Sequence, residues 1–223
     1  MKTRNLFFTL LAVLTPLLII TTGMRIALSP LFFTVEYRLP NFPPDPYGFT
    51  LEDRLKWADF SIDFISGKID EGTYAAAQFP DGSPLFNERE ISHMVDVRVL
   101  TNAMLWVWRM LVILFVLAYF YARSISELPQ FLHALASGAK ATLALIAAIL
   151  LFLVINFNQL FTAFHRIFFE GDTWLFYNTD SLIRLFPLKF WQDLFIFIGA
   201  LSILFSLALV YASHRQRASA VRQ

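Results

Sequence analysis

The 223-residue sequence contains no cysteine. Disulfides, cysteine-ligated metal sites and a cysteine nucleophile are therefore excluded. The sequence also lacks an excess of one charge, since it has 18 Lys and Arg and 17 Asp and Glu. A net charge of +1 gives no reason to expect nucleic acid as a partner. Because the sequence has no His-x-x-x-His spacing and no Ser-His-Asp signature, we expect no metal, no cofactor and no catalytic triad.

Apolar residues are what the sequence has in excess, with 57% hydrophobic residues and 25 Phe. This composition is typical of an integral membrane protein. Residues 6–28, 104–121, 142–157 and 194–211 are long enough, or nearly so, to cross a hydrocarbon core of about 30 Å as helices. We therefore predict an all-α membrane protein, a single membrane domain over residues 1–223 with four transmembrane helices. The first segment lacks a small-residue cleavage pattern, so we expect a retained span and not a signal peptide.

The placement of Lys and Arg predicts the orientation of these spans, because basic residues concentrate on the cytoplasmic side. Residues 30–102 carry 12 acids against 6 Lys and Arg, and with residues 158–192 they are predicted to be extracytoplasmic. Both chain ends are predicted to be cytoplasmic. Apart from one acid, Glu127, the cytoplasmic parts would carry only basic charge, from Lys2, Arg4, Arg123, Lys140, Arg215, Arg217 and Arg222.

The long segment between the first two spans contains recognisable local signals. Four prolines within residues 40–46 forbid a helix and favour an extended or turning path. Thr50 followed by acids predicts a helix N-terminus, and this helix should end near Gly67. Asn87 and Glu90 resemble a capping box, after which no helix breaker occurs until Ser124. We therefore predict that the second span extends outward as one continuous helix that carries His93.

Two histidines, His93 and His165, lie just outside the second and third apolar segments. At 1.5 Å per residue, His93 lies roughly 45 Å from Arg123 and His165 roughly 38 Å from Lys140, which puts both imidazoles in the outer interfacial zone. Asp96 shares a helix face with His93 and could orient its ring. The two histidine-bearing faces could converge. The alternative is that both histidines, like the five tryptophans, only anchor helices at the headgroup level.

These residues carry a resemblance to a known family. The motif Ser92-His93-Met94-x-Asp96-Val97 is followed one span later by Phe164-His165-x-Ile167-Phe168-Phe169, then by Trp174-x-Phe176 and by Asp180-x-Leu182-Ile183-x-x-Phe186-Pro187. The combination resembles the lipoprotein intramolecular transacylase (Lit) family of bacterial membrane proteins, and the likeness covers nearly the whole chain. Tyr177 departs from the pattern, in which an acidic residue often follows Trp-x-Phe.

The resemblance implies an acyltransferase of the bacterial inner membrane with its active site at the outer leaflet interface. Its substrate would be a diacylated bacterial lipoprotein, whose sn-2 acyl chain moves from the diacylglyceryl group to the α-amino group of the N-terminal cysteine. Membrane lipids are the other expected partners. Ester aminolysis needs a base and an acid, and we assign these roles to His165 and His93, favouring His165 as the base; the sequence alone leaves the reverse order open. The remaining residues that we expect to orient the site or bind substrate are Asp96, Arg98, Arg166, Asp172, Trp174 and Asp180.

Two other functions remain open at this point. An accessory membrane protein would bind a lipid or protein partner through its outer segment, and its histidines would be dispensable anchors. An interfacial lipid or lipoprotein acyl hydrolase would use the same histidines but would release a free fatty acid. A transporter is disfavoured, because the spans contain few ionisable residues at mid-depth.

Overall fold

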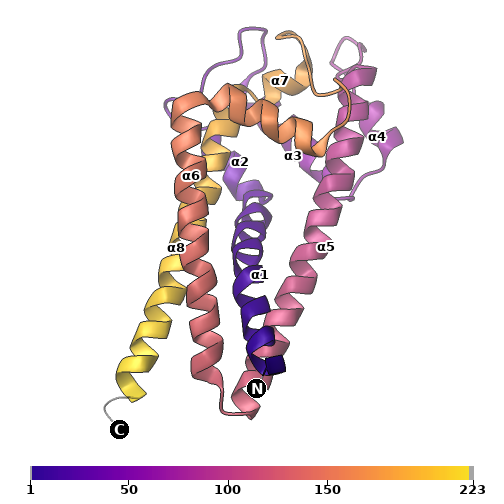
Figure 1. Ribbon diagram of the computed structural model, residues 1–223. Helices are drawn as coiled ribbons and strands as arrows, with labels where there is room; N and C mark the ends of the chain where they lie inside the picture. Colours follow the sequence, from indigo (N-terminus) through magenta and orange to yellow (C-terminus); the bar gives the residue numbers. More distant parts are fainter. Residues whose placement is uncertain (1, 221–223) are drawn as a thin grey trace. The chain divides into compact units, whose positions relative to one another are not determined.

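The computed structural model describes residues 2–220, which are almost entirely α-helical. In this range there is no strand, and the single isolated β-bridge joins Gln78 to Pro84. The predicted all-α class is thus confirmed. The helices follow one another along the chain (Figure 1) as α1 Lys2–Ala27, α2 Pro30–Glu36, α3 Leu51–Ile65, α4 Glu71–Ala75, α5 Glu88–Ser124, α6 Leu128–Phe168, α7 Ser181–Leu185 and α8 Leu188–Ala220.

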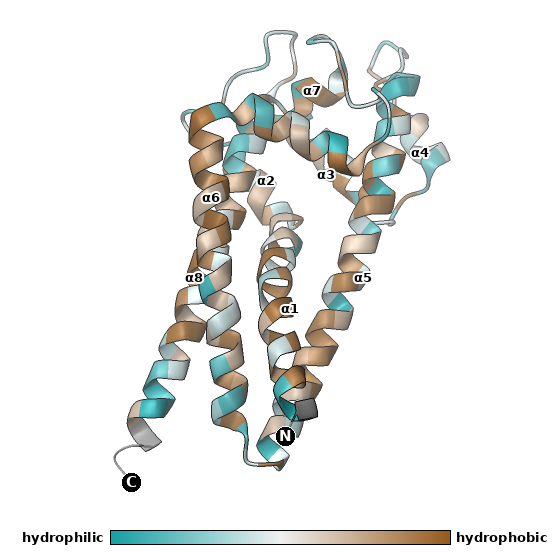
Figure 2. Ribbon diagram, viewed as in Figure 1, coloured by the Kyte–Doolittle hydropathy of each residue, from teal (hydrophilic) through white to brown (hydrophobic). Residues whose placement is uncertain are grey.

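Four of these helices, α1, α5, α6 and α8, are long and apolar enough to cross a membrane, as the sequence predicts. Each predicted span lies within one of them to within a residue. The helices are longer than the apolar segments because their polar flanks contain nothing that breaks a helix. Figure 2 shows this for α5, whose middle is largely hydrophobic and whose first turns carry hydrophilic residues. The predicted continuous helix that carries His93 is therefore confirmed.

The helix α6 is interrupted at Asn156, which has non-helical backbone angles (φ −159°, ψ 83°). The Asn156 side chain accepts a hydrogen bond from the backbone N–H of Gln159 (3.1 Å), so it caps the stretch that leads to His165. The sequence-based distance of His165 from Lys140 assumed an unbroken helix. That assumption is wrong, because the rise per residue is not maintained through Asn156.

The chain divides into two compact units. The first consists of residues 2–26, 105–152 and 196–220 and contains most of the four long helices. Within it α1 and α6 pack closely at Gly138, where an added Cβ atom would lie 2.3 Å from the Ala12 carbonyl oxygen and 2.5 Å from the Thr15 Cβ. Small residues at such crossings let helices approach without hydrocarbon between them. The unit also has a buried apolar core of residues from α1, α5 and α6.

The second unit, residues 27–104 and 153–195, contains the short helices and the polar ends of the long ones. Its helix α3 begins at the predicted N-cap, since Thr50 accepts from the Asp53 N–H (3.1 Å) and Asp53 accepts from the Thr50 N–H (3.0 Å). Tyr74 of α4 is fully buried and stacks on Phe64 of α3 (4.3 Å between ring centroids) and on Phe86 (4.6 Å). This stack of aromatic rings joins α3, α4 and the segment that leads into α5.

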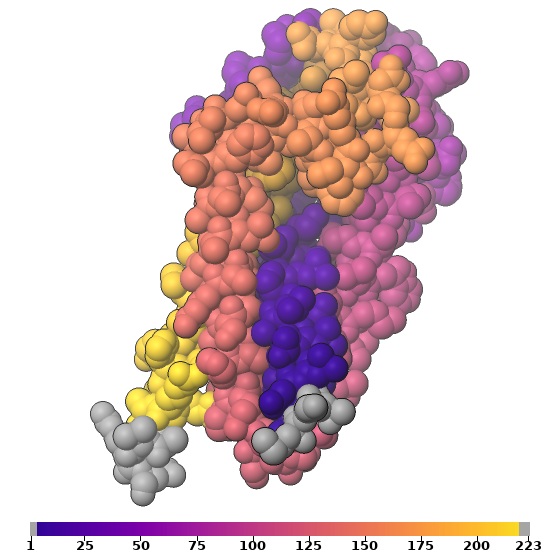
Figure 3. Space-filling model, viewed as in Figure 1, coloured from indigo at the N-terminus to yellow at the C-terminus, as the bar shows by residue number. Residues whose placement is uncertain are grey.

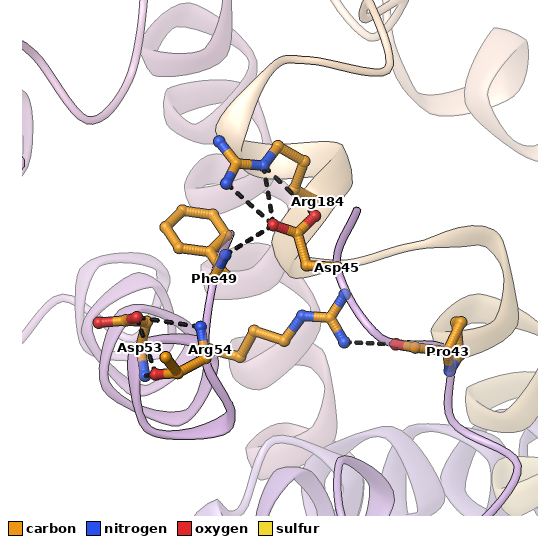
Figure 4. A network of polar contacts seen from close by, with 7 residues as sticks. Pro43, Asp45, Phe49, Asp53, Arg54 and Arg184 are labelled. Atoms are coloured by element: carbon orange, nitrogen blue, oxygen red, sulfur yellow. Dashed lines mark hydrogen bonds and ion pairs between the residues drawn. The ribbon is translucent and has the colours of Figure 1, made fainter. Parts of the chain in front are cut away.

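The proline-containing segment forms turns and no helix, as predicted, and two arginines hold it in place (Figure 4). Arg184 of α7 forms an ion pair with Asp45 (2.9 Å), and Arg54 of α3 donates a hydrogen bond to the Pro43 carbonyl oxygen (2.6 Å). Burial raises the pKa of Asp45, but hydrogen bonds from Arg184 and the Phe49 N–H outweigh it, so the pKa lies below its ordinary value. The segment is thereby attached to both α3 and α7.

Candidate active site

His93 and His165 face each other within the second unit. The centroids of their imidazole rings are 6.1 Å apart, and the ring planes are inclined by only 24°. His93 lies in the second turn of α5 and His165 in the last turn of α6. Both side chains are buried, with exposed fractions of 6% and 5%. The two histidine-bearing helix faces thus converge, although 72 residues of chain separate the two histidines.

Aromatic side chains enclose the two imidazoles. On the His93 side the nearest ring centroids belong to Phe169 (4.9 Å) and Phe176 (5.4 Å). On the His165 side they belong to Phe161 (4.0 Å) and Trp174 (5.0 Å). Such a surrounding excludes water from the rings and leaves few groups that could pair with a proton on them. We refer to these four aromatic residues as the aromatic cage.

The Nδ1 atom of His165 lies 2.8 Å from the backbone carbonyl oxygen of Phe161. A carbonyl oxygen can only accept a hydrogen bond, so Nδ1 must carry the proton. In the neutral imidazole the other nitrogen, Nε2, is then unprotonated and has a free lone pair. The helix backbone therefore sets the tautomer of His165 and directs its basic nitrogen away from α6.

The Nδ1 atom of His93 is buried and has no hydrogen-bond partner among the described residues. Asp96, which we expected to orient this ring, has an exposed side chain and forms no hydrogen bond with it. Although Asp96 and His93 are three residues apart, His93 is turned inward toward the aromatic cage and Asp96 outward. Ring contacts, and not a carboxylate, hold the His93 imidazole.

A buried carboxylate, Glu90, joins the start of α5 to the start of α7. Glu90 Oε2 accepts from the Asn87 N–H (2.8 Å), and Asn87 Oδ1 accepts from the Glu90 N–H (3.1 Å), which confirms the predicted capping box. The other oxygen, Oε1, accepts from the Leu182 N–H at the start of α7 (2.5 Å). Glu90 is 1% exposed and lies one turn before His93. Its carboxylate therefore connects the turn that carries His93 to α7.

Of the other predicted site residues, some contact the histidines or the start of α5 and others are exposed. Trp174 contacts His165, as described, and Asp180 accepts hydrogen bonds from the Asn87 side chain (3.2 Å) and the Tyr177 N–H (2.8 Å). Figure 3 shows the segment between α6 and α7 (orange) lying against the first turns of α5 (magenta), where Arg89 donates to the Leu175 carbonyl oxygen (3.2 Å). Asp172 and Arg166 are exposed and form no side-chain hydrogen bond or ion pair with described residues.

Arg98 lies on a different face of α5 from His93, because five residues turn a helix by roughly 140° beyond one full turn. Its guanidinium stacks over Phe64 (5.0 Å to the ring centroid) and contacts neither histidine. Within the part of the chain that the structure describes, no group of three His, Asp or Glu side chains could hold a metal ion.

The fold and the site define a class of protein. It is a multi-pass helical membrane protein with two buried histidines that face each other. The family model of the lipoprotein intramolecular transacylase Lit matches residues 9–191, and the chain belongs to this family. The family consists of acyltransferases that act on lipoproteins.

Known proteins resemble the chain over nearly its whole length. An uncharacterized protein of Aquifex aeolicus (strain VF5) is 31% identical over 209 residues, which are 93% of each chain. The solved structure of the membrane integral lipoprotein intramolecular transacylase Lit from Bacillus cereus has a TM-score of 0.81 at 21% identity, covering 100% of this chain and 99% of that one. A structure of the same Bacillus cereus protein with a histidine-to-alanine mutation has a TM-score of 0.76 at 19% identity, with coverage of 100% and 97%.

Proposed function

We propose that the protein transfers the sn-2 acyl chain of a diacylglyceryl-modified lipoprotein to the α-amino group of its N-terminal cysteine. The product is an N-acyl, S-monoacylglyceryl lipoprotein. The observation that carries this proposal is the pair of buried imidazoles 6.1 Å apart in a chain of the Lit family. Two acid/base groups, in a sequence with no cysteine and no Ser-His-Asp signature, suit direct transfer between two groups of one substrate.

In the proposed reaction the substrate amine attacks the carbonyl carbon of the sn-2 ester. A C–N bond forms, and Nε2 of His165 accepts a proton from the attacking nitrogen. The tetrahedral intermediate then collapses, the bond between the carbonyl carbon and the glycerol oxygen breaks, and His93 delivers a proton to that oxygen. The proton lost by the nitrogen is thus balanced by the proton gained by the glycerol hydroxyl. Passage of a proton from His165 to His93 then restores both histidines to their starting states before the next turnover.

The assignment of His165 as the base rests on its tautomer. The Phe161 carbonyl holds the proton on Nδ1, so Nε2 is ready to accept another one. The backbone carbonyl also stabilises the imidazolium that forms, because the Nδ1–H bond becomes charge-assisted. Holding the amine and the ester in one site supplies much of the remaining rate by proximity. The aromatic cage excludes water and so disfavours hydrolysis of the ester.

We also propose that the protein lies in the bacterial inner membrane with both chain ends in the cytoplasm and residues 30–102 and 158–192 outside. Contacts within the first unit support a common side for the chain ends. Arg4 of α1 pairs with Glu127 of the α5–α6 turn (2.6 Å), and Arg217 of α8 hydrogen-bonds His133 of α6. Basic residues prevail at this end of the unit, in agreement with the positive-inside rule.

The test is the loss of free amine from a synthetic diacylglyceryl lipopeptide incubated with the purified protein. We expect His165→Ala and His93→Ala each to slow the reaction by about 10²-fold or more, the usual contribution of a general acid or base. His214→Ala is the matched control, since His214 is exposed in the first unit and should leave the rate unchanged.

Three outcomes would contradict the proposal. Retained activity in both His93→Ala and His165→Ala would exclude the histidine pair as the acid/base groups. Release of free fatty acid with the amine still free would identify an acyl hydrolase. A lipopeptide unchanged by the wild-type protein, but retained on it, would favour an accessory role in which the substrate is only bound.

A further inference from the structure

The second unit has an open pocket of about 430 Å³ on the face of α5 that points away from His93. Its residues on α5 are spaced at i, i+3, i+4 and i+7, so they form one continuous helix face. This face is roughly opposite to that of His93, given 100° of rotation per residue. The pocket is therefore distinct from the candidate active site. It is lined by Phe64, Glu71, Val95, Arg98, Val99 and Asn102.

Arg98 presents a cation to this pocket in a fixed orientation. Its guanidinium lies over the buried ring of Phe64, 5.0 Å from the ring centroid. One terminal nitrogen of Arg98 lies 3.9 Å from the position that a Cβ atom of Gly67 would occupy. Because Gly67 has no side chain, it does not cover this nitrogen. The guanidinium forms no ion pair with a carboxylate of residues 4–218. A stacked arginine with free donors is suited to binding phosphate through two parallel hydrogen bonds.

Glu71 presents an anion to the same pocket. It lies in the first turn of α4, its side chain is exposed, and it pairs with no cation of the described chain. Although Glu71 and Arg98 line one pocket, they form no ion pair with each other. Asn102 donates to the Arg98 carbonyl oxygen (2.9 Å), which leaves its own side-chain oxygen as an acceptor. The pocket thus offers a cation and a separate anion to one ligand.

The apolar surroundings indicate what kind of ligand this is. Val99, which lines the pocket, is 66% exposed. Val95, one turn before it on the same face of α5, also lines the pocket. Apolar side chains exposed on a helix that is long and apolar enough to span a membrane are suited to contact with acyl chains.

We propose that this pocket binds the headgroup of an aminophospholipid of the phosphatidylethanolamine type. Its phosphate binds Arg98, its ammonium binds Glu71 and Asn102, and its acyl chains contact Val95 and Val99. This site does not depend on the proposed acyl transfer. It is a place for a bound membrane lipid, and the lipid need not react.

The test is a lipid-binding titration of the purified full-length protein by native mass spectrometry, with thermal unfolding as a second readout. The probes are phosphatidylethanolamine, phosphatidylglycerol, O-phosphoethanolamine and inorganic phosphate. For the wild-type protein we expect preferential binding of phosphatidylethanolamine. Arg98→Gln should weaken binding of both lipids about tenfold, and Arg98→Lys, which keeps the charge but not the two parallel hydrogen bonds, should weaken it less.

Glu71→Gln separates recognition of the ammonium from recognition of the phosphate. This variant should lose the preference for phosphatidylethanolamine over phosphatidylglycerol, because phosphatidylglycerol has no ammonium. Glu71 is exposed and bears no structural contact, so the variant remains informative even where an Arg98 variant fails to fold. Glu52→Gln, an exposed acid in the first turn of α3, is the matched control and should keep the preference.

Three results would overturn the proposal. The first is equal lipid binding by wild type and a folded Arg98→Gln variant. The second is an unchanged lipid preference in Glu71→Gln. The third is binding of O-phosphoethanolamine or inorganic phosphate as tight as that of the lipid, which would assign the pocket to a soluble phosphate compound.

Discussion

Replacing Glu90 by Gln should loosen the connection between α5 and α7 without changing the shape of the side chain. The carboxylate of Glu90 accepts two backbone hydrogen bonds, from Leu182 (2.5 Å) and Asn87 (2.8 Å). Gln has one acceptor oxygen, so it keeps one of these bonds and turns its NH₂ group toward the other N–H. A buried hydrogen bond to a charged group contributes about 1.5–3 kcal/mol, and one backbone N–H is left unpaired. We therefore expect a loss of about 2–3 kcal/mol in the free energy of unfolding.

For a chain of this size such a loss corresponds to a decrease in Tm of about 5–10 °C, measured by thermal unfolding in a fixed detergent. The rate of acyl transfer by Glu90→Gln should fall by a larger factor than the yield of folded protein, because His93 lies one turn after Glu90 on α5. Glu88→Gln is the matched control, since Glu88 is exposed in the same first turn and should leave the Tm unchanged. Equal Tm and activity in Glu90→Gln and Glu88→Gln would refute this reasoning.

Two further predictions concern the second unit. Asp45→Asn leaves the charge of Arg184 buried and unpaired, so it should cost about 3 kcal/mol in the free energy of unfolding. Asp63→Asn breaks an exposed pair with Lys68 and should lower the Tm much less. Comparable decreases in Tm for the two variants would contradict this. Burial, reinforced by the nearby Asp193 carboxylate, raises the pKa of Glu36 from 4.5 to about 7. A raised folded-state pKa gives stability that is complete below pH 4.5 and is lost as the pH rises to 7, so Glu36→Gln should remove this loss. Tm measured for both proteins from pH 4.5 to 8 tests this, and parallel pH profiles would refute it.

Local signals in the sequence predicted much of the fold. The four apolar segments became four long helices, and the caps at Thr50 and Asn87 lie at helix starts as predicted. These predictions succeeded because a cap and an apolar run depend on residues close together in the chain. The helix α2 was not predicted, although Pro30 follows the N-cap residue Ser29, because its seven residues continue the apolar composition of the first span.

Features that depend on contacts between distant residues could not be predicted in the same way. Glu90 was recognised as part of a capping box, but its bond to Leu182 spans 92 residues. The interruption of α6 at Asn156 involves neither Pro nor Gly, so the only sequence signal is a residue type that often caps helices. Phe176 was part of the family motif, yet nothing local indicated that its ring packs against His93.

The most direct test of the central claim is tandem mass spectrometry of the N-terminal peptide of a diacylglyceryl lipoprotein before and after incubation with the purified protein. Transfer within one substrate molecule predicts an unchanged total acyl mass, with one acyl chain moved from the glyceryl group to the cysteine nitrogen. His165→Ala should abolish this move. A peptide that loses one acyl mass, or that acquires its N-acyl chain from an isotope-labelled second lipid, would contradict intramolecular transfer by the histidine pair.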